Sequence, residues 1–153
     1  MVPGEPDADW HWLTKAIELS RRCPPSPSAF SVGAIVVAES GQVIATGYSR
    51  QTNPYDHAEE VALGGAAALA ADLGRATLYS SLEPCLRRVS RPIPCAQLVW
   101  ARGIRRIVIA WREPPVFQPG GGVQWLAAHG TEIVELGELA AEARAVNQAV
   151  LGL

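Results

Sequence analysis

The sequence predicts an α/β fold in which helices cover both faces of a mixed five-stranded sheet. Two strands joined by a tight turn come first, and strands then alternate with helical segments to the end of the chain. Hairpin strands are antiparallel, whereas strands separated by a helix usually run parallel, so a mixed sheet follows. The 153 residues suffice for one domain of ordinary size with a real core.

The N-terminal part is expected to form a helix and a hairpin after a flexible tail. Residues 1–8 are acidic and rich in proline, so we expect a tail there and a single domain at 9–153. Apolar side chains then recur at helical spacing, and the prolines after Cys23 end the helix. The expected elements are a helix at 10–22 and strands at 32–38 and 42–48, with a two-residue turn at Ser40 and Gly41.

The rest of the chain alternates between helix and strand. An alanine-rich helix is expected from His57 to about Leu73, although Gly64 and Gly65 weaken it by roughly 1 kcal/mol each. Short runs rich in β-branched residues predict further strands, and glycines end the helices between them. These elements are strands at 77–80, 106–111 and 131–135, and helices at 95–102, 123–129 and 137–151.

Composition narrows the class of protein. The net charge of -2 disfavours a nucleic-acid surface held by electrostatics, because such domains are usually strongly basic. The N-terminus lacks the regions of a signal peptide, and no apolar run approaches the roughly 20 residues of a membrane helix. A soluble, cytoplasmic protein is therefore expected. Its three cysteines are then more typical of thiols or metal ligands than of disulfides.

One histidine and two cysteines form the pattern around which the rest of the chain is organised. His57-Ala58-Glu59 opens a helix, and nine residues separate Cys85 from Cys95, each of which follows a proline. Zinc binds imidazole and thiolate well, and a catalytic zinc takes three protein ligands and leaves one position for water. Together with the nearby glutamate, this is the zinc-deaminase signature, in which the glutamate is acid and base without being a ligand.

The expected topology explains how these distant positions meet. Each follows a loop near the start of a helix or turn, and parallel strands bring such starts to the same edge of a sheet. Zinc lowers the pKa of bound water to roughly 7. Glu59 beside it can take the water's proton, pass it to a ring nitrogen, and later protonate the leaving amine in a separate transfer. The pattern therefore predicts hydrolytic loss of an exocyclic amine as ammonia.

Each residue also has a plainer interpretation. Alone, His57 and Glu59 are ordinary first-turn helix residues, and each cysteine is a buried thiol. A Cys85–Cys95 disulfide would suit a secreted protein. A purely structural zinc would want a fourth ligand, and the available candidates are Cys23, His11 and His129. The catalytic zinc is the interpretation that uses all four residues together.

These residues resemble the cytidine-deaminase superfamily, and within it the deaminase domain of the bifunctional riboflavin-biosynthesis deaminase/reductase. The similarity runs from about Trp10 to Leu136 and includes VGAIVV, HAEEVAL and ATLYSSLEPC. The long interval between the two cysteines points to the riboflavin-type branch, because most relatives have C-x-x-C. The reductase domain has no counterpart here, so at most a stand-alone deaminase is expected.

The resemblance implies a three-layer α/β/α sandwich of the cytidine-deaminase type that assembles into homodimers or homotetramers. The implied zinc ligands are His57, Cys85 and Cys95, with Glu59 as proton shuttle. A backbone contact from Ala58 to the substrate ring is also implied. The backbone from Ser81 to Pro84 is implied to accept a hydrogen bond from the departing amine.

Departures from the riboflavin-type pattern concern the substrate. An Asn-Pro-Asn type stretch is replaced by residues 28–31, and the segment between the cysteines carries Arg87, Arg88 and Arg91. Guanidinium suits phosphate, so these three arginines, Arg87 and Arg91 in particular, are candidates to bind a substrate phosphate, and a solvated loop is the alternative. Phe30 and Trp111 are candidates to stack on the base, and core packing is the alternative.

Ser49 follows the second strand, where relatives carry a polar group that faces the ligand's sugar; a surface serine is the alternative. The expected function is therefore deamination of a small aminopyrimidine, nucleoside or nucleotide by a Zn²⁺ enzyme. A nucleic-acid-editing deaminase is a second hypothesis, which salt-dependent binding would support. A zinc-stabilised binding protein without turnover is a third, and it predicts a fourth protein ligand.

Overall fold

Five strands form one mixed sheet within residues 1–88 and 91–152, the part of the chain that the computed structural model describes. The strands are β1 (Gly33–Val37), β2 (Val43–Tyr48), β3 (Thr77–Ser80), β4 (Arg106–Ile109) and β5 (Glu132–Glu135). Their order is β2-β1-β3-β4-β5, in which β1 is antiparallel to both neighbours while β3, β4 and β5 run parallel. The predicted mixed sheet is confirmed.

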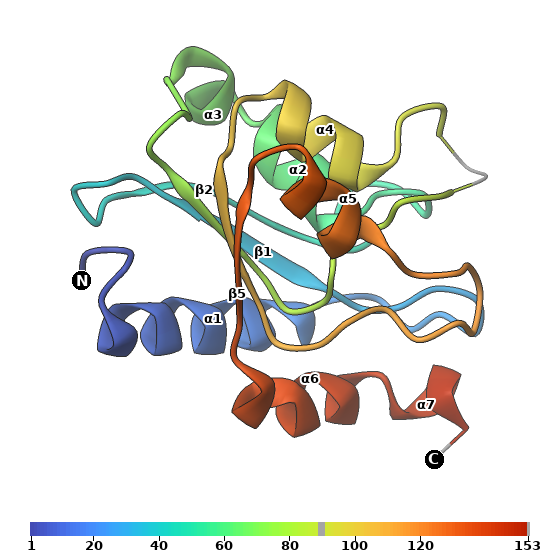
Figure 1. Cartoon of the computed structure of the whole chain (residues 1–153). Coiled ribbons are helices and arrows are strands. Elements are labelled where there is room, and N and C mark those ends of the chain that lie inside the picture. The colour runs from blue at the N-terminus through green and yellow to red at the C-terminus, as the bar shows by residue number, and fades with distance from the viewer. Residues whose placement is uncertain (89–90, 153) are drawn as a thin grey trace.

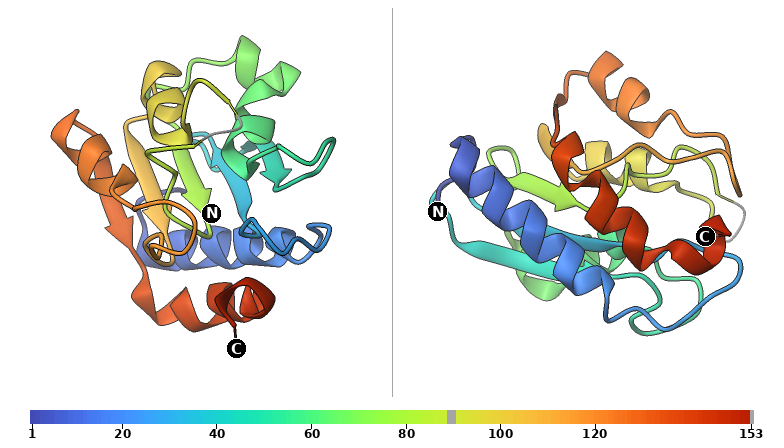
Figure 2. Two further views of the ribbon diagram at one scale, coloured as in Figure 1. Left: turned by 90° about the vertical axis from the view of Figure 1, so that its right-hand side faces the viewer. Right: turned by 90° about the horizontal axis from the view of Figure 1, so that it is seen from below.

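Helices cover both faces of the sheet, so the predicted three-layer sandwich is confirmed (Figures 1 and 2). One layer contains α1 (Pro6–Ser20), the 3-10 helix η1 (Gly137–Leu139), α6 (Ala140–Val146) and α7 (Gln148–Leu151). The other contains α2 (Ala58–Gly64), α3 (Ala66–Ala70), α4 (Cys95–Ala101) and α5 (Gly122–Ala128). All residues of β1 are buried, as is typical of a strand covered on both faces. Among the described residues, no helix is both long and apolar enough to cross a membrane.

Side chains of β3 alternate between the two helical layers, because successive residues of a strand point to opposite faces. The hydroxyl of Tyr79 donates to Asp9 of α1 over 2.6 Å. The next side chain, Ser80, hydrogen-bonds to Glu59 of α2 over 2.7 Å. The same strand thus anchors α1 on one face and supports the candidate site on the other.

Two helices differ from their expected bounds. α1 begins at Pro6, and Ala8 and Asp9 are buried, so the prediction of a tail through residue 8 is wrong for its last three residues. Proline is suited to the first turn of a helix, where its missing N–H is not needed. The helix expected at 57–73 is two helices, because Gly65 between them is extended, with a ψ of 150°. Residues 89, 90 and 153, which the expected loop and domain include, lie outside the described residues.

The hairpin and the C-terminal helix also differ from prediction. The hairpin loop is longer than two residues: Gly41 N–H donates to Ala38 O, and Ala38 N–H donates to Gln42 O. Gly41 has a φ of 93°, which glycine adopts without strain and which such loops require. The final helix is interrupted at Asn147, whose side chain is engaged elsewhere.

Candidate metal centre and active-site cavity

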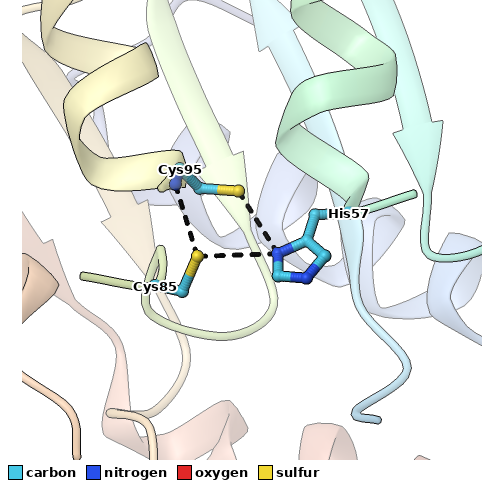
Figure 3. A group of neighbouring side chains, drawn as sticks. All are labelled: His57, Cys85 and Cys95. Carbon is cyan, nitrogen blue, oxygen red and sulfur yellow. Dashed lines mark hydrogen bonds between the residues drawn. The ribbon is translucent and has the colours of Figure 1, made fainter. Parts of the chain in front are cut away.

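His57, Cys85 and Cys95 meet beside the ends of α2 and α4 (Figure 3). His57 Nδ1 lies 3.6 Å from Cys85 Sγ and 3.4 Å from Cys95 Sγ. A tetrahedral zinc with ordinary bond lengths separates its nitrogen and sulfur ligands by about 3.5–3.8 Å, so this donor set fits zinc. The described residues supply no fourth member of the cluster. All three cysteines are described and are free thiols, so the disulfide alternative is wrong.

The loop before α2 holds His57 in place. Oδ2 of Asp56 accepts hydrogen bonds from Thr52 N–H, Thr52 Oγ1 and Asn53 N–H over 2.6–2.9 Å. Glu60 in the first turn of α2 then accepts from the His57 N–H over 3.2 Å. Because both sides of His57 are tied by hydrogen bonds, its backbone is set before any ligand binds.

Cys85 lies in the loop after β3, and Cys95 is the first residue of α4. Cys95 N–H donates to Cys85 Sγ over 3.3 Å. Hydrogen bonding from the Cys95 side chain, with His57 close by, lowers the pKa of Cys85. The same contact and burial raise the pKa of Cys95. The pair therefore loses its first proton readily, which favours metal binding because thiolate is the ligand form.

Glu59 lies on the inner wall beside the cluster. It is 3% exposed, and its Oε1 is 2.7 Å from Ser80 Oγ. Burial raises the pKa of Glu59, although the Ser80 hydrogen bond and the His57 charge oppose the shift. A carboxyl with a raised pKa in a cleft suits general acid–base chemistry near neutral pH.

The cluster opens onto a cavity of about 570 Å³. Four of the expected substrate-binding residues line it: Phe30, Ser49, Ala58 and Arg87. The Phe30 ring makes an edge-to-face contact with Phe117, 5.1 Å between ring centres. The Ser49 hydroxyl accepts from the Val32 N–H over 2.9 Å, so part of its hydrogen-bonding capacity is already used by the fold.

Ser81, Arg91 and Trp111 are not on the cavity wall. Ser81 Oγ accepts from the Gly33 N–H over 3.1 Å inside the sheet. Arg91 Nε is 3.5 Å from Glu60 Oε2, so a carboxylate lies beside this guanidinium, although the Arg91 side chain is 38% exposed. Trp111 packs behind Phe30 at 5.9 Å and lies under the Arg144 guanidinium at 5.8 Å. These three residues are therefore not among those that line the cavity.

Glu83 was missed by the sequence interpretation. Its carboxylate accepts from the N–H of Glu113 over 2.9 Å and of Val123 over 2.8 Å. It therefore joins the loop after β3 to the loop after β4 and to α5, next to Cys85. The sequence feature that could have identified Glu83 is its position directly before Pro84-Cys85.

Two further residues that the sequence interpretation missed, Arg50 and Asn147, hold the loop at 24–31 in place. Arg50 donates to the carbonyls of Pro24 and Phe30 over 2.7–3.1 Å, from a backbone with a φ of 58°. Asn147 pairs with the backbone of Ser31 in both directions: its Oδ1 accepts from Ser31 N–H and its Nδ2 donates to Ser31 O. A lone asparagine in an alanine-rich helix was the only sequence signal, because asparagine disfavours helix interiors.

Arg88 and Glu113 complete the charged surroundings of the cluster. Arg88, whose side chain is 3% exposed, has Nη1 3.9 Å from Cys95 Sγ and 3.4 Å from Glu60 Oε2. Glu113 lines the cavity, and burial together with the negative charges of Cys85, Glu83 and Glu59 raises its pKa to about 8. The sequence interpretation named Arg88 with Arg87 and Arg91 as a candidate for phosphate, and did not foresee its contact with the Cys95 sulfur.

Comparisons with known proteins agree with this geometry. The family model described as the cytidine and deoxycytidylate deaminase zinc-binding region matches residues 6–111. A diaminohydroxyphosphoribosylamino-pyrimidine deaminase of Schizosaccharomyces pombe is 33% identical over 126 residues, which are 81% of this chain and 31% of that protein. This chain thus spans about a third of that relative's length.

Solved structures show the same fold. The Thermotoga maritima diaminohydroxyphosphoribosylaminopyrimidine deaminase/5-amino-6-(5-phosphoribosylamino)uracil reductase is 33% identical, with a TM-score of 0.76, over 95% of this chain and 42% of that chain. The Aspergillus oryzae Rib2 deaminase in complex with DARIPP is 25% identical, with a TM-score of 0.74, over 95% of this chain and 100% of that chain. The matched region in each comparison contains most of the fold described above.

Proposed function

Because this chain belongs to the cytidine and deoxycytidylate deaminase family, we propose that it is a zinc-dependent hydrolase that removes an exocyclic amine from an aminopyrimidine as ammonia. One observation carries the proposal. His57, Cys85 and Cys95 converge on a cavity that Glu59 also lines, and the described residues offer the cluster no fourth protein ligand. A purely structural zinc would have its four positions filled by protein.

The proposed zinc ligands are His57, Cys85 and Cys95. Bound zinc supplies an attacking water whose pKa is lowered to roughly 7. Glu59 would take one proton from the attacking water and deliver it to the ring nitrogen. It would then take the remaining proton of the added hydroxyl, as the carbonyl forms, and pass it to the amine, which leaves as ammonia. Burial suits this role, because it brings the pKa of the carboxyl nearer to the working pH. The Leu82 and Glu83 backbone on the cavity wall is where the departing amine would find an acceptor.

We propose an aminopyrimidine nucleotide as the substrate. A cavity of about 570 Å³ is within the range that holds molecules of this size. Phe30 offers a ring for the base, and the exposed Arg87 at the wall offers a guanidinium for a phosphate. The Schizosaccharomyces pombe relative is named for a phosphoribosylamino-pyrimidine, which has both parts. A homodimer or homotetramer remains our expectation for the assembly.

The test combines metal analysis with ammonia release from a panel of aminopyrimidine bases, nucleosides and nucleotides. We expect about one zinc per chain and release from at least one nucleotide. Glu59→Gln should abolish release while keeping zinc, because the carboxamide preserves shape but cannot carry the proton. Cys95→Ser should lose zinc and activity together. Absence of zinc, or full activity in Glu59→Gln, would refute the proposal.

A further inference from the structure

Ser80, the last residue of β3, lies between the Glu59 carboxyl and the Leu82 carbonyl. Its Oγ is 2.7 Å from Glu59 Oε1 and 2.7 Å from Leu82 O. Ser80 is fully buried, whereas Glu59 and Leu82 both line the cavity. Within residues 1–88 and 91–152, no other side chain hydrogen-bonds to the Glu59 carboxyl.

We infer that Ser80 is a positioning residue for Glu59: its hydroxyl holds Oε1 in place and leaves Oε2 available for proton transfer. This inference rests on the deaminase function proposed above. A glutamate side chain has three rotatable torsions, so a carboxyl without a partner would sample several orientations. A single strong hydrogen bond selects one of them, and orientation of this kind contributes directly to rate.

A hydroxyl is suited to a partner that gains and loses a proton. It carries one donor proton and two lone pairs, whereas the Leu82 carbonyl can only accept. When Glu59 is a carboxylate, Ser80 donates to it. When Oε2 takes up a proton, Oε1 still carries lone pairs, so it can go on accepting a hydrogen bond from Ser80. The contact between Ser80 and Glu59 therefore persists through both halves of the proton transfer.

The backbone of Ser80 is held more firmly than a loop would allow. Ser80 pairs with Ala34 of β1 on one side and with Ile109 of β4 on the other. Groups on rigid central strands position a site more accurately than groups on loops. The hydroxyls of Ser49 and Ser81, by contrast, accept hydrogen bonds from the backbone N–H groups of Val32 and Gly33.

The test compares Ser80→Ala with Ser20→Ala. Ser20 is a matched control, because it is also buried and its hydroxyl donates to a backbone carbonyl, but it lies on α1. On the best substrate of the panel, Ser80→Ala should lower kcat roughly 10- to 100-fold, the range for one hydrogen bond to a charged group. KM should stay within about twofold, because Ser80 does not touch the substrate. Zinc content and Tm should match those of Ser20→Ala.

Three outcomes would count against the inference in different ways. An unchanged kcat in Ser80→Ala, with an active wild type, would overturn it alone. Loss of zinc or of folding in Ser80→Ala would assign Ser80 a purely structural role and would also overturn it. A wild-type protein that binds zinc but deaminates nothing would overturn the proposed function, and this inference with it. Ser80→Thr, which keeps the hydroxyl, should retain more of the wild-type kcat than Ser80→Ala.

Discussion

Asp9 and Arg106, which are 97 positions apart, are joined by two parallel hydrogen bonds. Arg106 Nη1 donates to Asp9 Oδ1 over 3.0 Å and Nη2 donates to Oδ2 over 2.6 Å. The Tyr79 hydroxyl donates to the same carboxylate over 2.6 Å. Asp9 is 4% exposed, so this pair ties α1 to β3 and β4 through a buried charge. The first helix is therefore held by a directional contact as well as by its apolar face.

Replacing Asp9 should destabilise the domain. Asp9→Asn should lower the free energy of unfolding by about 3 kcal/mol, because it leaves a largely buried guanidinium with a weaker partner. Urea unfolding at pH 7 measures the change. Asp7→Asn is the matched control, since Asp7 is exposed in the same turn, and it should stay within about 0.5 kcal/mol of wild type. Equal effects in the two variants would contradict the role assigned to the pair.

The same carboxyl should make stability depend on acid pH. Burial alone would raise the pKa of Asp9, but hydrogen bonds from Arg106, Tyr79 and Gly4 outweigh it and lower the pKa. A lowered folded-state pKa means that the stabilisation is complete above the unfolded value of about 3.9 and is lost as the pH falls through the folded value. The stability gap between wild type and Asp9→Asn should therefore be constant from about pH 7 to 5 and shrink below about pH 4. If this stability gap widened as the pH fell, the result would contradict a lowered pKa for Asp9.

Gly122 should be irreplaceable for a steric reason. A Cβ at this position would overlap the carbonyl oxygen of Pro84, the residue before Cys85. Gly122→Ala should therefore cost roughly 2 kcal/mol or more of stability and should reduce zinc content by displacing Cys85. Gly64→Ala is the control: nothing lies within 4 Å of its Cβ, so stability should be unchanged or rise by up to about 1 kcal/mol. Thermal unfolding with metal analysis of both variants measures this, and an unaffected Gly122→Ala would exclude the close contact.

The sheet and its helical layers were predicted well from the sequence, because strands and helices are visible in the local periodicity of apolar residues. The run at 32–38 and the short strand at 77–80 each contain enough β-branched and apolar residues to require burial. The ligand cluster was also predictable, since histidine and cysteine after loops have few alternative roles. The point at which Gly65 divides a helix was not predictable, because glycine weakens a helix without specifying where the chain turns.

Residues that act through long-range contacts escaped prediction for a different reason. Asn147 and Ser31 are 116 positions apart, and nothing in either neighbourhood indicates the other. Trp111 illustrates a related limit: an aromatic side chain at a strand end is compatible with stacking on a base, and the sequence does not show that this ring packs against Phe30. Arg91 likewise had the right charge for phosphate, and only the fold shows the carboxylates beside it.

Arg87 should distinguish phosphorylated from unphosphorylated substrates. Within the described part of the chain no carboxylate pairs with Arg87, and it lies on the cavity wall. Arg87→Ala should raise KM for a nucleotide roughly 10-fold or more, while KM for the matching nucleoside changes little. Arg91→Ala is the comparison, because Arg91 faces Glu60 and Asp56, and it should affect nucleotide and nucleoside alike. A selective effect in Arg91→Ala but not in Arg87→Ala would reverse this assignment.

Asn147, which lies between α6 and α7, should affect substrate binding through its hydrogen bonds to the loop that carries Phe30. Its carboxamide holds both backbone polar groups of Ser31, the residue after Phe30. Asn147→Ala would leave these groups without their partner, so it should cost about 1–3 kcal/mol of stability and raise KM by loosening the Phe30 side of the cavity. Gln148→Ala, one residue on and exposed, should change neither quantity. The cluster at His57 lies on the opposite side of the sheet from α6, so zinc content should be equal in both variants. A loss of zinc in Asn147→Ala would mean that the loop supports the metal site rather than the substrate.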